Sequence, residues 1–281
     1  NASGTSRMKL EMNRAWNEAV RLLNRSRDVI LVVAGVFFFL PYFAFMLIAP
    51  DPMAGVNPAT PLAAEQMFSR ITQFYSQVWW AFVLIAIVQA VGMLGLLALL
   101  TDRRRPTVAE ALKIGATKVV GYIVAYLLLG MALALAVMML ATLAALSGAQ
   151  ALVGLVVILA VVAWIAAFIR FSLVGPVMVK EGTANPLAAL KRSWTLTGGN
   201  GWRLFAFYAL LFVALLVVTI VASAVFGLIF GLLGTEAARV GDSLISSLAN
   251  AAWATIFLSV LSAVHDQLVG PSASTLSETF E

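Results

Sequence analysis

The sequence contains no cysteine and a single histidine. Disulfide bonds and thiolate chemistry are therefore excluded, and a zinc site of the usual cysteine and histidine type is nearly excluded as well. Charge is also scarce, because only 11% of the 281 residues are Asp, Glu, Lys or Arg, against about 25% in a soluble domain. So few charged side chains cannot cover a water-facing surface. Lipid must therefore surround most of the chain.

Hydrophobic residues make up 62% of the chain. A transmembrane helix needs about 20 consecutive apolar residues, and six stretches with almost no charge meet this requirement. They predict an all-α, polytopic membrane protein with a single six-helix domain over residues 8–268. The predicted spans, in chain order, are 29–48, 78–100, 119–146, 151–174, 203–233 and 243–264.

Two spans carry residues that disturb helices. Pro41 predicts a kink in the first span. The fifth charge-free run, 204–235, would extend ~48 Å as one helix, against a hydrocarbon core of ~30 Å. We therefore expect it to tilt, to project beyond the bilayer, or to break near Gly227, Gly231 or Gly234. The first two of these glycines also permit a close approach to another helix, by default within the chain and otherwise between chains.

Lysine and arginine are distributed unevenly over the ends of the spans. All but two of the 18 basic residues flank the ends that face the same side as the N-terminus, and the exceptions are Arg70 and Arg239. The positive-inside rule then places both chain termini in the cytoplasm. We expect a bacterial cytoplasmic (inner) membrane protein whose net charge of +5 reflects topology and not nucleic-acid binding.

The two ends of the chain look unlike the rest. Residues 1–7 are small and polar and precede Met8, so we expect a cloning remnant. Residues 269–281 are rich in serine and threonine, carry acidic charge and lack lysine and arginine. This composition predicts a disordered tail.

Three short basic segments resemble one another, and each precedes a pair of spans. They lie at 14–23, 107–113 and 185–194. Their apolar residues recur at helical spacing, which predicts three amphipathic helices along the inner membrane surface. The pattern fits a threefold repeat of interfacial helix plus transmembrane hairpin, or similar physics without common descent.

The stretch from 170 to 203 is the most distinctive part of the sequence. Its pattern consists of Arg170, Pro176, Glu181-Gly182, Ala189–Trp194, Gly198 or Gly199, and Trp202-Arg203. This pattern resembles the membrane domain attached to some glycerophosphoryl diester phosphodiesterases, and the YciC-like inner-membrane proteins. The resemblance implies a role in envelope or lipid homeostasis. It implies no phosphodiesterase activity for this chain, because in the fused relatives that chemistry belongs to a separate soluble domain.

Arg170 lies near the inner end of the fourth span. An arginine left in lipid costs at least about 2.5–3.5 kcal/mol, so this side chain needs a compensating environment. It could be an anchor or structural ion pair, with Asp266 as partner, or it could contact a lipid phosphate. His265 and Asp266 together read as a structural pair or, alternatively, as a proton relay.

Further candidates follow in the same basic region. Glu181 is expected to hold Lys191 or Arg192, or else to bind a cation or headgroup, and Gly182 to permit a turn. The glycine-rich run 198–201 is either a helix break or a holder of lipid phosphate. We predict that Arg170, Glu181, Lys191, Arg192 and Arg203 bind a lipid headgroup, and that Pro176, Gly182, Trp194, Gly199 and Asp266 have structural roles.

The sequence shows no acid–base pair, nucleophile arrangement or metal cluster, so we predict no catalytic residue, no metal, no cofactor and no enzyme. Three functions remain. The first is a non-catalytic protein that binds or organises membrane lipids. The second is a transporter for an amphipathic solute, which the scarcity of charge at mid-span disfavours if transport were ion-coupled. The third is an assembly partner of an envelope complex. Membrane lipids are the expected partners, with an envelope protein as a further one.

Overall fold

The computed structural model describes residues 9–49, 64–101 and 107–270, and within these ranges all regular structure is helical. Six of its continuous helical stretches are long and apolar enough to cross a membrane. The predicted all-α fold with six spans is therefore confirmed, and the chain is a multi-pass membrane protein. The expected cloning remnant and all but the first two residues of the expected tail lie outside the described residues.

The described residues form eleven helical elements. In chain order they are α1 (Met12–Arg25), α2 (Arg27–Ala34), the π-helical η1 (Gly35–Phe39), α3 (Leu40–Ile48), α4 (Ala64–Thr101), α5 (Val108–Leu146), α6 (Gln150–Phe171), α7 (Val174–Lys180), α8 (Pro186–Leu196), α9 (Gly201–Leu232) and α10 (Thr235–Val269).

The first span consists of α2, η1 and α3. Pro41 has no N–H to donate to the preceding turn, and the helix widens just before it, where the Leu40 amide donates to the Gly35 carbonyl five residues back. The irregularity predicted at Pro41 is thus a π-helical segment. Asn250 of α10 donates to the Phe38 carbonyl in this segment at 3.0 Å, which is the hydrogen bond between helices expected of a polar residue inside a span.

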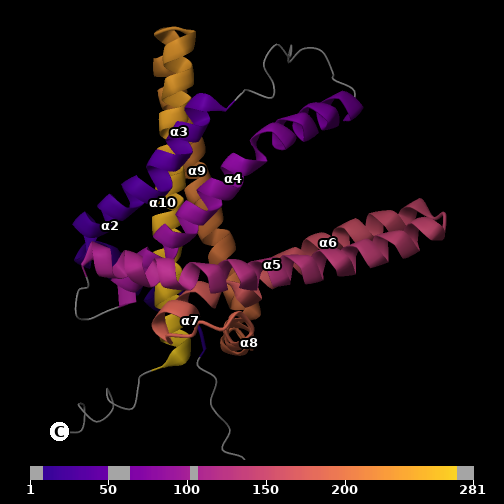
Figure 1. Ribbon diagram of the computed structural model, residues 1–281, viewed down its shortest axis with the longest axis horizontal. Helices are drawn as coiled ribbons and strands as arrows, with labels where there is room; N and C mark the ends of the chain where they lie inside the picture. The colour runs from indigo at the N-terminus through magenta and orange to yellow at the C-terminus, as the bar shows by residue number, and fades with distance from the viewer. Residues whose placement is uncertain (1–8, 50–63, 102–106, 271–281) are drawn as a thin grey trace, which may run out of the picture.

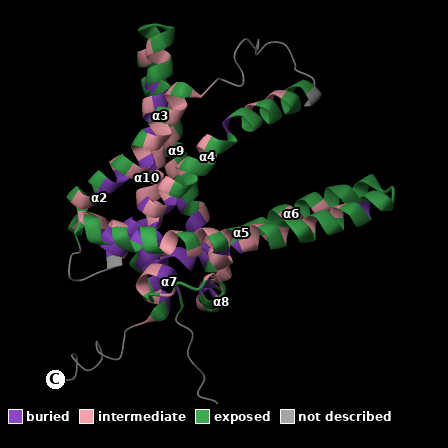
Figure 2. Ribbon diagram, viewed as in Figure 1, coloured by how far each residue is buried: buried purple, intermediate pink, exposed green. Residues whose placement is uncertain are grey.

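Helix α10 is the central element of the bundle. It packs against α1, α3, α4 and α9, and α9 runs beside it over most of its length (Figure 1). The buried residues gather where α4, α5 and α10 meet (Figure 2). The largest fully buried apolar side chains include Leu94, Leu96, Leu97, Leu173, Leu204, Val260 and Val264.

The hairpin of α5 and α6 projects sideways from this core (Figure 1). Its outer half is exposed around its surface (Figure 2), and no charged residue occurs between Val119 and Ile169. Helices that are apolar all round are suited to a lipid environment. The hairpin contacts the rest of the molecule through its base, against α4, α7, α8 and α9.

Several helices extend beyond the predicted spans. Helix α4 begins at Ala64, well before the second span predicted at 78–100. The second interfacial helix, expected at 107–113, is not separate, because α5 continues from Val108 to Leu146 without interruption. Thr107 and Glu110 cap its start reciprocally, and no proline occurs between Val108 and Leu146 to break it. A separate short helix therefore exists in the first and third segments, as α1 and α8, but not in the second.

The close approach predicted at Gly227 and Gly231 to another helix of the same chain is wrong. Helix α9 passes through both without a break, and no atom lies within 4 Å of a Cβ built at either position. The chain turns at Gly234 instead, where φ is 109°, a conformation that glycine adopts without strain.

Helices α4 and α5 cross with their backbones close together at Gly115. A Cβ built on Gly115 would lie 2.5 Å from the Val91 carbonyl oxygen and 2.9 Å from the Gly95 nitrogen. Both are backbone atoms, which cannot move without displacing a helix. Glycine at position 115 therefore sets the distance between α4 and the base of the hairpin.

We expect Gly115→Ala to destabilise the protein, because the added methyl group must force α4 and α5 apart, at a cost of about 1–3 kcal/mol. Gly130→Ala is the matched control on the same helix, since a Cβ there meets nothing within 4 Å, and alanine favours the helix. Thermal unfolding in detergent should show a lower midpoint for the first variant only. Equal midpoints would contradict the close crossing.

Candidate functional site

The chain bends sharply between α6 and α7. Pro176 lies in the first turn of α7 and has no N–H for the Ser172 carbonyl, so a straight helix cannot run through this point. Helix α6 therefore ends at Phe171 and leaves its last carbonyl groups without backbone partners.

Side-chain hydroxyls from other elements satisfy these carbonyl groups. Ser193 of α8 donates to the Arg170 carbonyl at 2.8 Å, and Thr197, just after α8, approaches the same oxygen at 3.3 Å. Tyr126 of α5 donates to the Phe171 carbonyl at 3.0 Å. Ser172 donates to the Ile169 carbonyl at 2.9 Å. The end of α6 is thereby fixed to α5 and α8.

The Arg170 side chain leaves this fixed point toward α8. Its Cζ lies 4.7 Å from the centre of the Trp194 ring, which is a cation–π contact. The expected ion pair with Asp266 is wrong, because Asp266 binds Lys180 instead. Trp194 is half-exposed and also contacts Phe171, with ring centres 5.6 Å apart.

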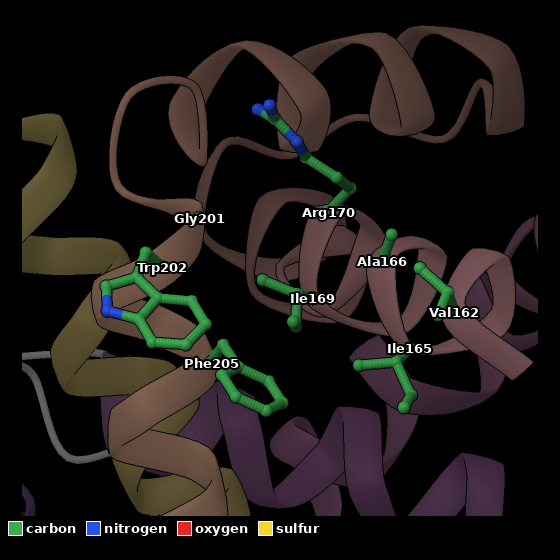
Figure 3. Close-up of a pocket in the computed structure, with 8 residues that line it drawn as sticks. All are labelled: Val162, Ile165, Ala166, Ile169, Arg170, Gly201, Trp202 and Phe205. Carbon is green, nitrogen blue, oxygen red and sulfur yellow. The ribbon is translucent and has the colours of Figure 1, made fainter.

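An apolar groove lies between α6 and α9, beside Arg170. Its volume is about 360 Å³, which falls within the usual range for small-ligand pockets. Figure 3 shows the apolar side chains of α6 on one wall and the rings of α9 on the other, with the Arg170 guanidinium directed away from the apolar side chains. The lining residues are Val162, Ile165, Ala166, Ile169, Arg170, Gly201, Trp202 and Phe205.

The N-terminal segment holds the start of α9. The Leu10 amide donates to Asn200 Oδ1 at 3.0 Å, and Arg203 Nη1 donates to the Leu10 carbonyl at 3.2 Å. Leu10 and Asn200 are both buried. Arg203 was predicted to bind a lipid headgroup. In the structure it contacts Leu10, and this contact fixes the turn that precedes Trp202.

An ion pair joins α7 to α10 near the same end of the bundle. Lys180 Nζ lies 2.7 Å from Asp266 Oδ1 and donates to the Ser262 carbonyl at 3.0 Å. The Lys180 side chain is 5% exposed and that of Asp266 is 50% exposed. Sequence reasoning had assigned no role to Lys180.

Glu181 connects one further helix, α8, to the two helices of this ion pair. Arg192 of α8 binds its carboxylate through Nε, at 2.9 and 3.1 Å, which confirms one of the two pairings expected for Glu181. The buried His265 of α10 places Nε2 at 3.2 Å from the same carboxylate. Its Nδ1 is 3.5 Å from Asp266 Oδ1, too far for a good hydrogen bond. The cluster links α7, α8 and α10.

The remaining predicted residues lie in the surrounding turns. Gly182 and Gly199 have φ values of 72° and 81°, so both occupy the left-handed conformation that glycine favours. Lys118 donates to the Gly182 carbonyl at 2.5 Å. Lys191 is exposed on α8.

Several residues at this site were missed from the sequence, above all Ser193, Thr197, Tyr126 and Trp202. The signal for the first two was their spacing, since residues four apart share one face of a helix. No group of three or more metal-ligating side chains occurs among the residues that the structure describes. The arrangement offers binding chemistry: one cation, aromatic rings and an apolar wall.

We expect Asp266→Ala to destabilise the protein more than Lys180→Met. The first change leaves a buried ammonium group without its counter-ion, whereas the second leaves a half-exposed carboxylate that water can solvate. Thermal unfolding of the two variants in one detergent measures the difference. The opposite order would show that Lys180 is not held mainly by Asp266.

The hydroxyl cap of α6 predicts a non-additive effect. Ser193→Ala alone should cost little, since Thr197 still reaches the Arg170 carbonyl. The double variant Ser193→Ala, Thr197→Val leaves that buried carbonyl unpaired, at about 1–3 kcal/mol. A double-mutant cycle from unfolding midpoints tests this, and simple additivity would argue against a shared acceptor.

Comparison with known proteins supplies no relative for this arrangement. No family model, curated protein or solved structure matches the chain. The resemblance of residues 170–203 to the phosphodiesterase-associated membrane domain and the YciC-like proteins therefore stays a prediction, and the function has to be argued from the geometry of the groove and its rim.

Proposed function

We propose that this protein is a non-catalytic component of the bacterial inner membrane that binds membrane lipids, with a role in envelope homeostasis. The observation that carries the proposal is the position of Arg170 at one end of the apolar groove between α6 and α9. A cation beside an apolar channel matches the two parts of a phospholipid, its phosphate and its acyl chain.

The position of the groove along the spans supports this proposal. Both of its walls belong to helices long and apolar enough to cross a membrane, and Arg170 lies in the last turn of α6. The exposed Trp202 and Trp194 are the residue type that concentrates at membrane interfaces. Arg170 would then lie at headgroup depth, with the apolar wall of α6, which runs across α9 (Figure 1), beside it.

The orientation supports the cytoplasmic leaflet as the source of the lipid. The basic residues of α1, α8 and the start of α9 lie at the same end of the bundle as Arg170, and the positive-inside rule places that end in the cytoplasm. Anionic lipids in that leaflet attract such residues by about 1 kcal/mol each.

Native mass spectrometry of protein released gently from its own membrane tests the proposal. We expect one lipid class to be retained above its share of the bulk membrane. Arg170→Gln should reduce this enrichment several-fold, because the guanidinium that binds the phosphate is lost. Arg21→Gln is the control, since Arg21 is an exposed cation at the same end of the bundle, held by Glu18 on α1.

Two other results would redirect the interpretation. Lipid adducts that mirror the bulk membrane would contradict specific lipid binding and favour assembly with an envelope protein. A retained amphipathic solute in place of lipid would favour transport.

A further inference from the structure

The charge balance of the groove bears on the kind of lipid it takes. Of its eight lining residues, Arg170 alone is charged, and none is acidic. The nearby carboxylates already have partners. Glu181 binds Arg192 and His265, and Asp266 binds Lys180. The groove therefore offers one positive charge, and its lining offers no acceptor for an ammonium group.

The guanidinium of Arg170 is held in place. The Arg170 main-chain carbonyl accepts a hydrogen bond from Ser193 at 2.8 Å, and the guanidinium carbon lies 4.7 Å from the centre of the Trp194 ring. Stacking on an aromatic ring covers a face of the planar group and leaves its edge N–H groups free to donate. Two parallel N–H groups match two oxygens of a phosphate, a geometry that lysine cannot provide.

The apolar wall accommodates part of one acyl chain. On α6 it extends from Ile169 back to Val162, which is about 10 Å along the helix axis. On α9 the rings of Trp202 and Phe205, 5.2 Å apart between centres, form the facing wall (Figure 3).

We infer that the groove selects a phospholipid whose headgroup is a phosphodiester with a net charge of −1, over a zwitterionic lipid with the same acyl chains. This inference rests on the proposed function. One guanidinium balances one phosphodiester charge, whereas the ammonium of a zwitterionic headgroup finds no carboxylate in the lining. A phosphomonoester carries a second negative charge that nothing in the lining balances.

The test is a competition in detergent, read by native mass spectrometry on the full chain. Equimolar phosphatidylglycerol, phosphatidylethanolamine and phosphatidic acid with identical acyl chains are added, together with the matching free fatty acid. We expect phosphatidylglycerol to be bound over phosphatidylethanolamine by roughly tenfold, the scale of one hydrogen-bonded charge pair. Arg170→Gln should abolish most of this preference, because it removes the one charge of the lining, while Arg21→Gln should retain it.

A second variant tests the groove without changing Arg170. Ala166→Phe places a ring in the channel and should lower the binding of all four lipids alike. Its thermal unfolding midpoint, with those of the other variants, shows whether the fold is kept.

The outcomes separate the inference from the function on which it rests. Equal binding of phosphatidylglycerol and phosphatidylethanolamine, both reduced by Ala166→Phe, would overturn the headgroup inference and leave lipid binding standing. Preference for phosphatidic acid or the fatty acid would overturn the inference as well. Binding of none of the four above the background of a control membrane protein would overturn both.

Discussion

The end of α6 imposes the constraint on which the site depends. In apolar surroundings a main-chain carbonyl without a partner costs several kcal/mol, and Pro176 prevents the helix from continuing to supply those partners. Hydroxyl groups of Tyr126 and Ser193 supply them instead. Because these groups come from α5 and the α8 segment, satisfying one helix end also fixes the position of two others.

The site follows from this fixed point. With the Arg170 main chain held, its side chain extends toward α8 and meets the Trp194 ring. The far wall of the groove is fixed separately, since Leu10 binds Asn200 and Arg203 at the turn that opens α9. Two independent sets of polar contacts therefore hold the two walls, while the space between them stays apolar and open to the membrane.

The extent of successful prediction differs between the fold and the site. Uncharged apolar runs are a local signal, so the six spans could be read from the sequence, as could the Glu181–Arg192 pair across one short turn. The partner of Asp266 could not be predicted from the sequence. Lys180 and Arg170 are both expected at the same membrane side as Asp266, and only the bend at Pro176 decides which of them reaches it. The pair of glycines at 227 and 231 predicted a close approach between helices, but the close approach of α4 and α5 occurs at Gly115. Glycine spacing shows that helices can approach closely, and the contact of two particular helices decides where they do.

The most direct measurement is a cryo-EM map of the protein in nanodiscs made with its own membrane lipids. The account predicts density along the α6 wall of the groove, ending in a phosphate within hydrogen-bonding distance of the Arg170 guanidinium, with the ring of Trp194 behind that group. A groove closed by direct packing of α6 on α9, or an Arg170 that instead forms an ion pair within the chain, would contradict it.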